Sequence, residues 1–203
     1  MPVAAEPTTR ERVLVAAAEL LRRQGYAGTG LKQISIASRT PFGSLYHHFP
    51  GGKEQLGVEV LRTGGAFFLA LYDAIAAEAP DLATAVERFF AGAAATLEAT
   101  AYADACPIAT VAGEVASTHD ALRTAADQAF VSWLDALARD ARSAGIGPDA
   151  AASLATQVLA LLEGAFLLSR TRRSTQPMRD CSAAAVALVE AAVPRHDDPG
   201  GSR

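Results

Sequence analysis

The run of residues 37–56, ASRTPFGSLYHHFPGGKEQL, gathers several side chains that could carry chemistry. It contains two adjacent histidines, His47 and His48, which could act in catalysis or bind a metal ion. Adjacent helical residues point about 100° apart, and neither histidine has an acidic or cysteine partner one helical turn further along the chain. We therefore expect no metal site and no cofactor, with one histidine exposed and the other packed or acting as a cap.

Cys106 is the second candidate for chemistry, because it precedes Pro107 at a predicted helix start. The start of a helix can lower the pKa of a thiol, but a nucleophilic or redox-active thiol also needs a nearby histidine or a second cysteine. Cys181 and His119 form no such motif with it. Redox sensing, pocket lining and plain packing stay open for Cys106. A helical enzyme that uses His or Cys chemistry is an alternative, but we expect no enzyme.

The composition indicates which elements hold these residues. Half of the residues are apolar and aromatic residues are sparse, so the core must consist mostly of Ala, Leu and Val. Such a composition suits close-packed helices, because Ala has the highest helix propensity. No run shows the strict apolar alternation of a strand. The sequence predicts an all-α fold with helices at 10–24, 31–37, 41–48, 53–79, 82–101, 107–117, 119–144, 149–172 and 178–193.

The charge is distributed unevenly along the chain. The net charge is −4, yet residues 1–62 contain eight basic and five acidic residues, which gives this part +3 and the remainder −7. A basic N-terminal part on an acidic body indicates that the N-terminal part meets a polyanion.

Two short helices joined by the tight turn SRTP, and preceded by a longer helix, are typical of a helix-turn-helix motif. The second short helix is expected to enter the major groove of DNA. Gly43 allows close approach to a neighbouring helix or to the phosphate backbone. Ser44, Tyr46, His47 and Lys53 are suited to phosphate oxygens, and the dipole at the start of the helix from Lys53 favours a phosphate there.

The segments GYAGTGLKQIS and GSLYHHFPGGKEQL closely resemble the DNA-binding region of the TetR family of bacterial repressors. The form PGGKEQL, together with CPIATVAGEVA at 106–116, resembles the LmrA/YxaF-like subgroup. The resemblance implies a dimeric repressor that binds a palindromic operator in double-stranded DNA and responds to a small apolar or aromatic effector, such as a polyphenol or an apolar antibiotic. On this basis Lys32, Ser44, Tyr46, His47 and Lys53 are expected to bind DNA. The complete predicted DNA-binding set also includes Arg39, Thr40, Phe42 and Gly43.

The sequence departs from the family pattern at two positions. Arg39 stands where the turn generally has a glycine, and a left-handed backbone at an arginine costs about 1 kcal/mol, so we expect the turn to differ locally. Phe42 stands where the subgroup commonly has a lysine. It is suited to touch a thymine methyl group, or else the contact shifts to Arg39. Both alternatives stay open, and the operator preference is expected to be set at these two positions.

Three regions follow from this interpretation. Residues 1–52 are predicted to be the helix-turn-helix DNA-binding domain. Residues 53–194 are predicted to form a larger helical domain for effector binding and dimerisation, with 53–79 as its connecting helix. Residues 195–203 are predicted to be a disordered tail. Large rings on Ala-rich helices can leave a cavity between the helices. The predicted effector pocket comprises Phe67, Leu71, Phe90, Leu97, Cys106, Glu114, Trp133, Phe166 and Arg170. A DNA-binding protein whose body serves only for dimerisation is the other alternative.

The last two helices carry extensive apolar faces, which favours an intersubunit four-helix bundle over an ordinary pair of core helices. The predicted dimer interface comprises Leu154, Val158, Leu161, Leu162, Ala165, Leu168, Val186 and Val189. The N-terminal segment lacks the pattern of a signal peptide. The longest apolar run, 158–168, is too short to span a membrane and contains Glu163. We therefore expect a cytoplasmic homodimer without a membrane partner.

Overall fold

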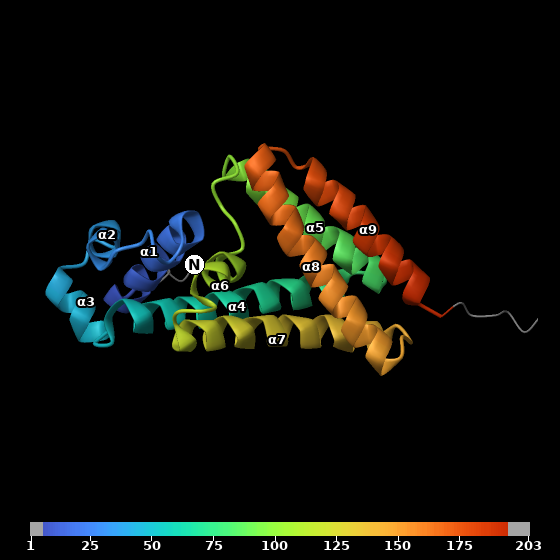
Figure 1. Ribbon diagram of the computed structural model, residues 1–203, viewed down its shortest axis with the longest axis horizontal. Coiled ribbons are helices and arrows are strands. Elements are labelled where there is room, and N and C mark those ends of the chain that lie inside the picture. Colours follow the sequence, from blue (N-terminus) through green and yellow to red (C-terminus); the bar gives the residue numbers. More distant parts are fainter. Residues whose placement is uncertain (1–5, 195–203) are drawn as a thin grey trace, which may run out of the picture. The chain divides into compact units, whose positions relative to one another are not determined.

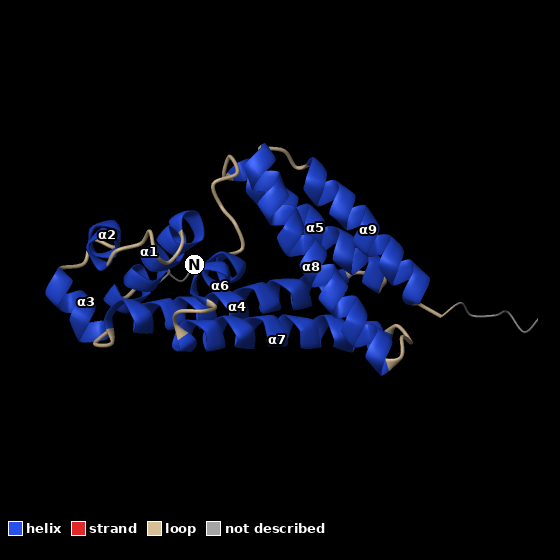
Figure 2. Cartoon of the chain, in the orientation of Figure 1, coloured by secondary structure: helices blue, strands red, loops and turns tan. Residues whose placement is uncertain are grey.

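The computed structural model describes residues 6–194, and every regular element among them is a helix (Figure 2). The all-α prediction is confirmed, whereas the tail predicted at 195–203 lies outside the described residues. The helices are α1 (Thr9–Gln24), α2 (Leu31–Ala37), α3 (Phe42–His48), α4 (Gly52–Glu78), α5 (Leu82–Ala99), α6 (Pro107–Val115), α7 (Asp120–Ser143), α8 (Pro148–Arg172) and α9 (Gln176–Ala192).

The first helix illustrates how local sequence sets these boundaries. Thr8 and Glu11 form a reciprocal capping box, in which the Glu11 amide donates to Thr8 Oγ1 at 3.2 Å and the Thr8 amide donates to Glu11 Oε2 at 2.7 Å. These hydrogen bonds satisfy amides that have no partner within the helix, and those from Thr8 lower the pKa of Glu11. The helix ends at Gly25, whose φ of +74° favours glycine.

The chain folds into two compact units. The head unit comprises the residues up to Ala70 together with Ala99–Ser132, and so contains α1 to α3, most of α4, α6 and the first half of α7. The body unit comprises Leu71–Glu98 and the residues from Trp133 onward, and so contains the end of α4, most of α5, the second half of α7, α8 and α9. The three-region division at residues 52 and 194 stays a prediction.

Buried aliphatic and aromatic side chains from the helix-turn-helix and from α4 form the core of the head unit. Ile34, Leu45 and Phe49 are buried, and α4 adds Leu56 and Leu61. This packing holds the two short helices against the longer ones, because helices of seven residues are not stable alone in water.

Helices α4 and α7 approach closely within the head unit. A Cβ atom added at Gly65 would lie 2.7 Å from Cβ of Ala129, and one added at Gly57 would lie 2.7 Å from a methyl group of Leu122. Such contacts are too short for real Cβ atoms. Gly65 is therefore required for this helix spacing, because Cβ of Ala129 cannot move aside, whereas at Gly57 the Leu122 side chain would have to shift.

In the body unit, α8 and α9 pack side by side along their length (Figure 1). Ala165 and Ala185 are fully buried, and small side chains of this kind let two helices lie close together. Near the end of α4, the ring of Tyr72 packs edge-on against Phe89 on α5, with 5.6 Å between the ring centroids.

By length and composition alone, α4 and α8 could each cross a membrane. Core helices of water-soluble proteins meet the same criterion. Here α4 supplies side chains to the core of the head unit and α8 packs against α9, so both helices have a packing role within the chain.

Candidate nucleic-acid interface

The turn between α2 and α3 is built from backbone and hydroxyl hydrogen bonds. The Thr40 amide donates to the carbonyl of Ser35 at 3.0 Å, and the Ser35 hydroxyl donates to the carbonyl of Thr40 at 2.6 Å. Arg39 lies between them with a φ of +51°. The turn therefore keeps its left-handed residue although that residue is an arginine, and the expectation of a locally different turn is not met at this position.

Thr40 differs from the other predicted DNA contacts because it is buried. Only 2% of its surface is exposed, and its hydroxyl donates to the carbonyl of Ser38 at 3.3 Å. Its side chain thus stabilises the turn and is not available to a ligand at the surface. The sequence-based prediction that Thr40 contacts DNA is thus not supported by its position, whereas the neighbouring Arg39 is exposed.

The exposed face of α3 is aromatic. Phe42 and Tyr46 lie one helical turn apart and are 46% and 44% exposed, with their rings edge to face and 5.2 Å between the centroids. Gly43 is exposed, and a Cβ atom there would meet no other atom within 4 Å. Gly43 therefore does not serve a close contact within this chain. Leu45 on the same helix is fully buried and anchors α3 in the core of the head unit.

The remaining predicted contacts flank this face. Lys32 on α2 and His47 on α3 are exposed, and Ser44 is half-buried. His48 is also half-buried, with its ring edge-on to that of His47, which agrees with one histidine at the surface and one packed. Among the described residues no group of His, Cys, Asp or Glu could hold a metal ion.

Lys53 at the start of α4 is half-buried, and its ammonium lies 4.2 Å from the centroid of the Tyr26 ring. Tyr26 belongs to the loop between α1 and α2. Burial lowers the pKa of Lys53, and the negative charge of Glu114 acts in the opposite direction. Lys53 is therefore engaged within the head unit, unlike the exposed Lys32.

Two carboxylates join α1 and the loop after it to α6 and the loop before it. Asp104, whose side chain is almost fully buried, pairs with Arg22 at 2.9 Å and with Arg23 at 3.3 Å. Glu114 Oε2 accepts a hydrogen bond from the Ala27 amide at 2.7 Å. Sequence reasoning missed Asp104 and Tyr26, and it assigned Glu114 to the effector pocket. These contacts join residues more than 80 positions apart, so no local spacing could reveal them.

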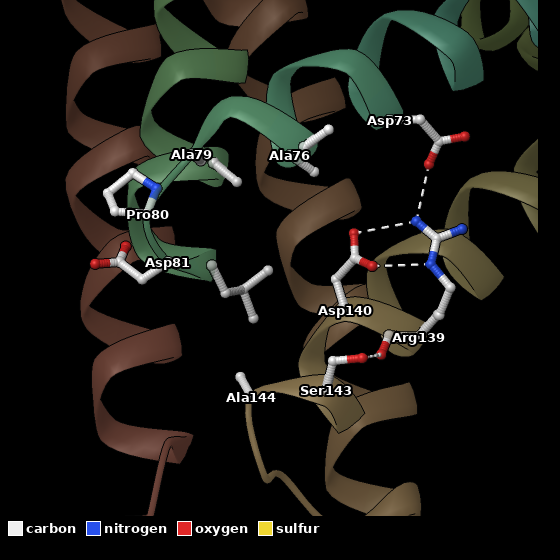
Figure 3. A pocket seen from close by; sticks show the side chains of 12 residues that line it. Asp73, Ala76, Ala79, Pro80, Asp81, Arg139, Asp140, Ser143 and Ala144 are labelled. Carbon is white, nitrogen blue, oxygen red and sulfur yellow. Dashed lines mark hydrogen bonds and ion pairs between the residues drawn. The ribbon is translucent and has the colours of Figure 1, made fainter.

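The body unit contains a pocket of about 510 Å³ between the end of α4, the start of α5 and the end of α7 (Figure 3). On one wall Arg139 pairs with Asp73 and with Asp140, each at 2.8 Å. The rest of the lining is mostly alanine, with Pro80, Asp81, Leu82 and Ser143. The charged groups of this wall already bind one another, and none of the nine residues predicted for the effector pocket lines it.

The nine predicted effector residues are divided between the units. Phe67, Cys106 and Glu114 belong to the head unit, and the other six belong to the body unit. Phe90, Leu97 and Cys106 are buried, whereas Phe67 and Leu71 on α4 are exposed. Cys106 caps α6, where its sulfur accepts a hydrogen bond from the Ala109 amide. The residues of intermediate burial are Trp133, Phe166 and Arg170.

The residues predicted for the dimer interface are mostly buried within the chain itself. The buried residues of this set are Leu154, Val158, Leu162, Ala165 and Val189. Leu161 and Val186 are half-buried, and Leu168 is exposed. The apolar pattern that suggested an interface thus largely reflects packing of α8 and α9 inside one body unit. Leu167 and Leu188 are exposed as well, and sequence reasoning did not single them out.

Solved structures of bacterial regulators are similar to the fold of this chain. A TetR transcriptional regulator from Legionella pneumophila matches with a TM-score of 0.79 at 23% sequence identity, over 94% of this chain and 100% of that chain. A regulatory protein TetR from Rhodobacter sphaeroides matches with a TM-score of 0.81 at 22% identity, over 89% of this chain and 98% of that chain. The chain thus has the fold of these solved structures.

The sequence comparisons give the family. Residues 13–60 match the bacterial regulatory proteins of the tetR family, and residues 83–184 match the C-terminal domain of LmrA/YxaF-like transcriptional regulators. LmrA of Bacillus subtilis is 33% identical over 170 residues, which cover 84% of this chain and 90% of that protein, and YxaF of the same organism is 34% identical over 84% and 89%. The chain belongs to the TetR family of DNA-binding transcriptional regulators.

Within that family its C-terminal part is of the LmrA/YxaF-like type, as the sequence resemblance predicted. The family and these relatives are transcriptional regulators and not enzymes, which agrees with the prediction that the protein has no enzymatic activity.

Proposed function

We propose that the protein is a dimeric repressor that binds a palindromic operator and is released from it by a small apolar or aromatic effector. The observation that carries the proposal is the exposed face of α3, where Phe42, Gly43 and Tyr46 project from a helix anchored by the buried Leu45. Exposed aromatic side chains on a short helix held by a tight turn suit insertion into the major groove.

The DNA contacts would divide by type. Tyr46, His47, Lys32 and Lys53 suit phosphate oxygens, which position a protein on the duplex without reading its sequence. Phe42, by contrast, carries no hydrogen-bonding group and suits an apolar base edge such as the thymine methyl group. Arg39 in the exposed turn is the nearest cation to this face in the sequence.

The dimer would form through exposed small and apolar side chains on α8 and α9. Leu167 and Leu168 are 67% and 51% exposed, and Gly164 one turn earlier has open space around it. Leu188 provides an exposed apolar side chain on α9. Small residues let a partner helix approach, and aliphatic residues supply the apolar area, so the two helices suit half of an intersubunit four-helix bundle. A twofold axis would place two α3 helices on half-sites of a palindrome.

The effector would bind in the C-terminal helices. The support is the set of large apolar side chains of the body unit that are incompletely buried, because Leu71 at the end of α4 is exposed and Trp133 and Phe166 are half-buried. Residues 53–194 would form this effector-binding and dimerisation domain. Arg170 is a candidate for orienting a polar group of the effector.

The repressor assignment draws support from a relative. The transcriptional repressor DhaR of Mycobacterium sp. strain GP1 is 25% identical over 183 residues, which cover 86% of this chain and 88% of that protein. A repressor of the protein's own promoter or of a neighbouring gene would act in the cytoplasm, where the DNA is.

The test begins with the intergenic DNA upstream of the protein's own gene and of its neighbour, searched for an inverted repeat. Fluorescence anisotropy with a labelled duplex of that repeat is expected to show saturable binding, with two chains per duplex. Scrambling one half-site should weaken binding strongly. Equal affinity for the repeat and for a scrambled duplex would contradict operator recognition.

The effector part is tested separately with the same complex. A panel of planar aromatic and apolar compounds is titrated into the protein–operator complex, and a true effector lowers operator affinity by about five- to hundredfold. Direct binding of the same compound to the DNA-free protein must accompany the release. Operator binding that no member of the panel changes would favour a regulator whose body serves only for dimerisation.

A further inference from the structure

The ammonium of Lys53 already has a partner within the chain, although the proposed function assigns it to a DNA phosphate. It lies 4.2 Å from the centroid of the Tyr26 ring, which is within the range of a cation–π contact. The side chain is half-buried in this position. To reach a phosphate, the ammonium has either to break its contact with the Tyr26 ring or to contact the ring and the phosphate at the same time.

Tyr26 is held in place and cannot follow the lysine. Its side chain is buried, and its ring contacts the edge of the His119 ring with 5.2 Å between the centroids. On the side of α4, a Cβ atom added at Gly57 would lie 3.1 Å from the Tyr26 ring. The ring is therefore a fixed surface between the α1–α2 loop, α4 and the loop before α7.

Glu114 adds a full negative charge to this surface. Its Oε2 accepts the hydrogen bond of the Ala27 amide at 2.7 Å, next to Tyr26 in the chain. Its Oε1 fills the space above Gly25, where a Cβ atom would lie only 1.7 Å away. The carboxylate is thus fixed by a backbone group of the α1–α2 loop, and its negative charge raises the pKa of Lys53 against the larger, opposite effect of burial.

We propose that Tyr26 and Glu114 form a resting site for the Lys53 ammonium, that this site competes with a DNA phosphate for it, and that Glu114 is therefore a positioning residue that sets operator affinity. The inference rests on the proposed function, since it needs Lys53 to contact DNA. It goes beyond that function because it gives Glu114, on α6, a direct electrostatic effect on a DNA-binding side chain. The residue has two separable roles, since its oxygen anchors the loop and its charge holds the lysine.

The variant Glu114→Gln separates these roles, because the amide oxygen can still accept the Ala27 hydrogen bond while the charge is gone. We expect it to bind the operator about two- to fivefold more tightly per head, because the loss of a solvent-screened charge interaction at the protein surface corresponds to a change of this size. The matched control is Glu19→Gln on α1, which removes the same charge from an exposed i,i+4 pair with Arg23. The control corrects for the change in net charge of the protein.

A double-mutant cycle with Lys53→Ala completes the test. Lys53→Ala is expected to weaken operator binding and to reduce the slope of log affinity against log salt by about one per head. In the Lys53→Ala background, Glu114→Gln should bring no gain beyond that of Glu19→Gln. A gain that persists without Lys53, or a Glu114→Gln protein that matches the Glu19→Gln control, would overturn the inference.

The outcomes distinguish the inference from the function on which it rests. If the wild-type protein binds no operator, the proposed function fails. If the wild type binds and Lys53→Ala weakens binding but Glu114→Gln gives no tightening, only the resting site is wrong. If the wild type binds and Lys53→Ala binds as the wild type does, Lys53 does not contact DNA and the inference is overturned while operator binding stands.

A measurement on the wild-type chain avoids any effect of the substitutions on folding. In the DNA-free protein, the Cε protons of Lys53 should be shifted upfield in the NMR spectrum by the Tyr26 ring current. On addition of operator the shift should move toward the value of an exposed lysine. An upfield shift that operator leaves unchanged would refute the competition, and so would its absence in the free protein.

Discussion

At the scale of single residues, Arg39 combines a structural cost with an exposed charge. Its φ of +51° places an arginine where glycine is favoured. Arg39→Gly is expected to raise the melting temperature, by up to about 4 °C, because the left-handed strain of about 1 kcal/mol is removed. The same change should weaken operator binding, because a cation beside the recognition helix is lost. Thermal melting and anisotropy titration measure the two effects.

Arg39→Lys is the control for this prediction. It keeps both the charge and the left-handed strain, so its melting temperature and operator affinity should stay near those of the wild type. If Arg39→Gly melts below the wild type, the turn does not hold the strain that its backbone angle indicates.

Phe42 and Tyr46 are adjacent on α3 but are expected to respond differently to substitution. Tyr46→Ala should weaken binding to every duplex by about tenfold, as loss of a hydrogen bond to a charged phosphate implies. Phe42→Ala should instead reduce discrimination at one base pair by about 1 kcal/mol. Competition with a set of single-base operator variants separates a uniform loss from a change in preference.

The contact between the Phe42 and Tyr46 rings predicts that the effects of the two substitutions are not additive. With their centroids 5.2 Å apart, each ring supports the other, and such pairs contribute about 0.5–1.5 kcal/mol. The double variant should therefore lose less affinity than the sum of the single variants. If both single variants bind the operator with the affinity and base preference of the wild type, α3 does not contact DNA.

At the scale of elements, the helix boundaries were largely predictable because they depend on local chemistry. The Thr8 cap, Pro41 before α3 and Pro107 at the start of α6 all act on residues within one turn of themselves. The site was only partly predictable. The sequence contains no local sign that Thr40 turns inward or that Glu114 anchors the loop after α1, because these follow from tertiary packing.

The dimer helices show the same limit of periodicity. An apolar stripe on α8 indicates burial, but it does not say whether the covering surface belongs to the same chain or to another. Val158 and Ala165 are buried inside one body unit, whereas Leu168 from the same pattern is exposed. Only the three-dimensional packing separates the two kinds of position.

The spacing of α4 and α7 can be tested with two neighbouring glycines. Gly64→Ala meets only ordinary contacts, at 3.8 Å or more, so the higher helix propensity of Ala should stabilise the protein by about 0.5–1 kcal/mol. Gly65→Ala gains the same propensity, but its Cβ would lie 2.7 Å from Cβ of Ala129, which cannot rotate away. Forcing the helices apart costs about 1–3 kcal/mol.

Chemical denaturation of both variants measures the difference directly. We expect Gly64→Ala to unfold at higher denaturant concentration than the wild type, and Gly65→Ala at lower concentration than Gly64→Ala. Identical midpoints for the two variants would mean that α4 and α7 are not in close contact at Gly65.

At the scale of the whole molecule, the assembly depends on the exposed faces of α8 and α9. Leu168→Glu places a charge at an exposed aliphatic position of the proposed interface, and burying an unpaired carboxylate is strongly unfavourable. The variant is expected to be a folded monomer by sedimentation equilibrium, where the wild type is a dimer. Its operator affinity should fall by orders of magnitude, because one α3 helix contacts a single half-site.

Val15→Glu is the matched control, since Val15 is also an exposed aliphatic residue but lies on α1 in the head unit. It introduces the same charge without touching α8 or α9, so it should remain dimeric. Circular dichroism has to confirm that both variants keep the helical content of the wild type. A dimeric Leu168→Glu protein would exclude this face as the interface. A monomeric Val15→Glu protein would instead place the interface on α1. In that case the twofold axis that relates the two α3 helices would pass between the head units.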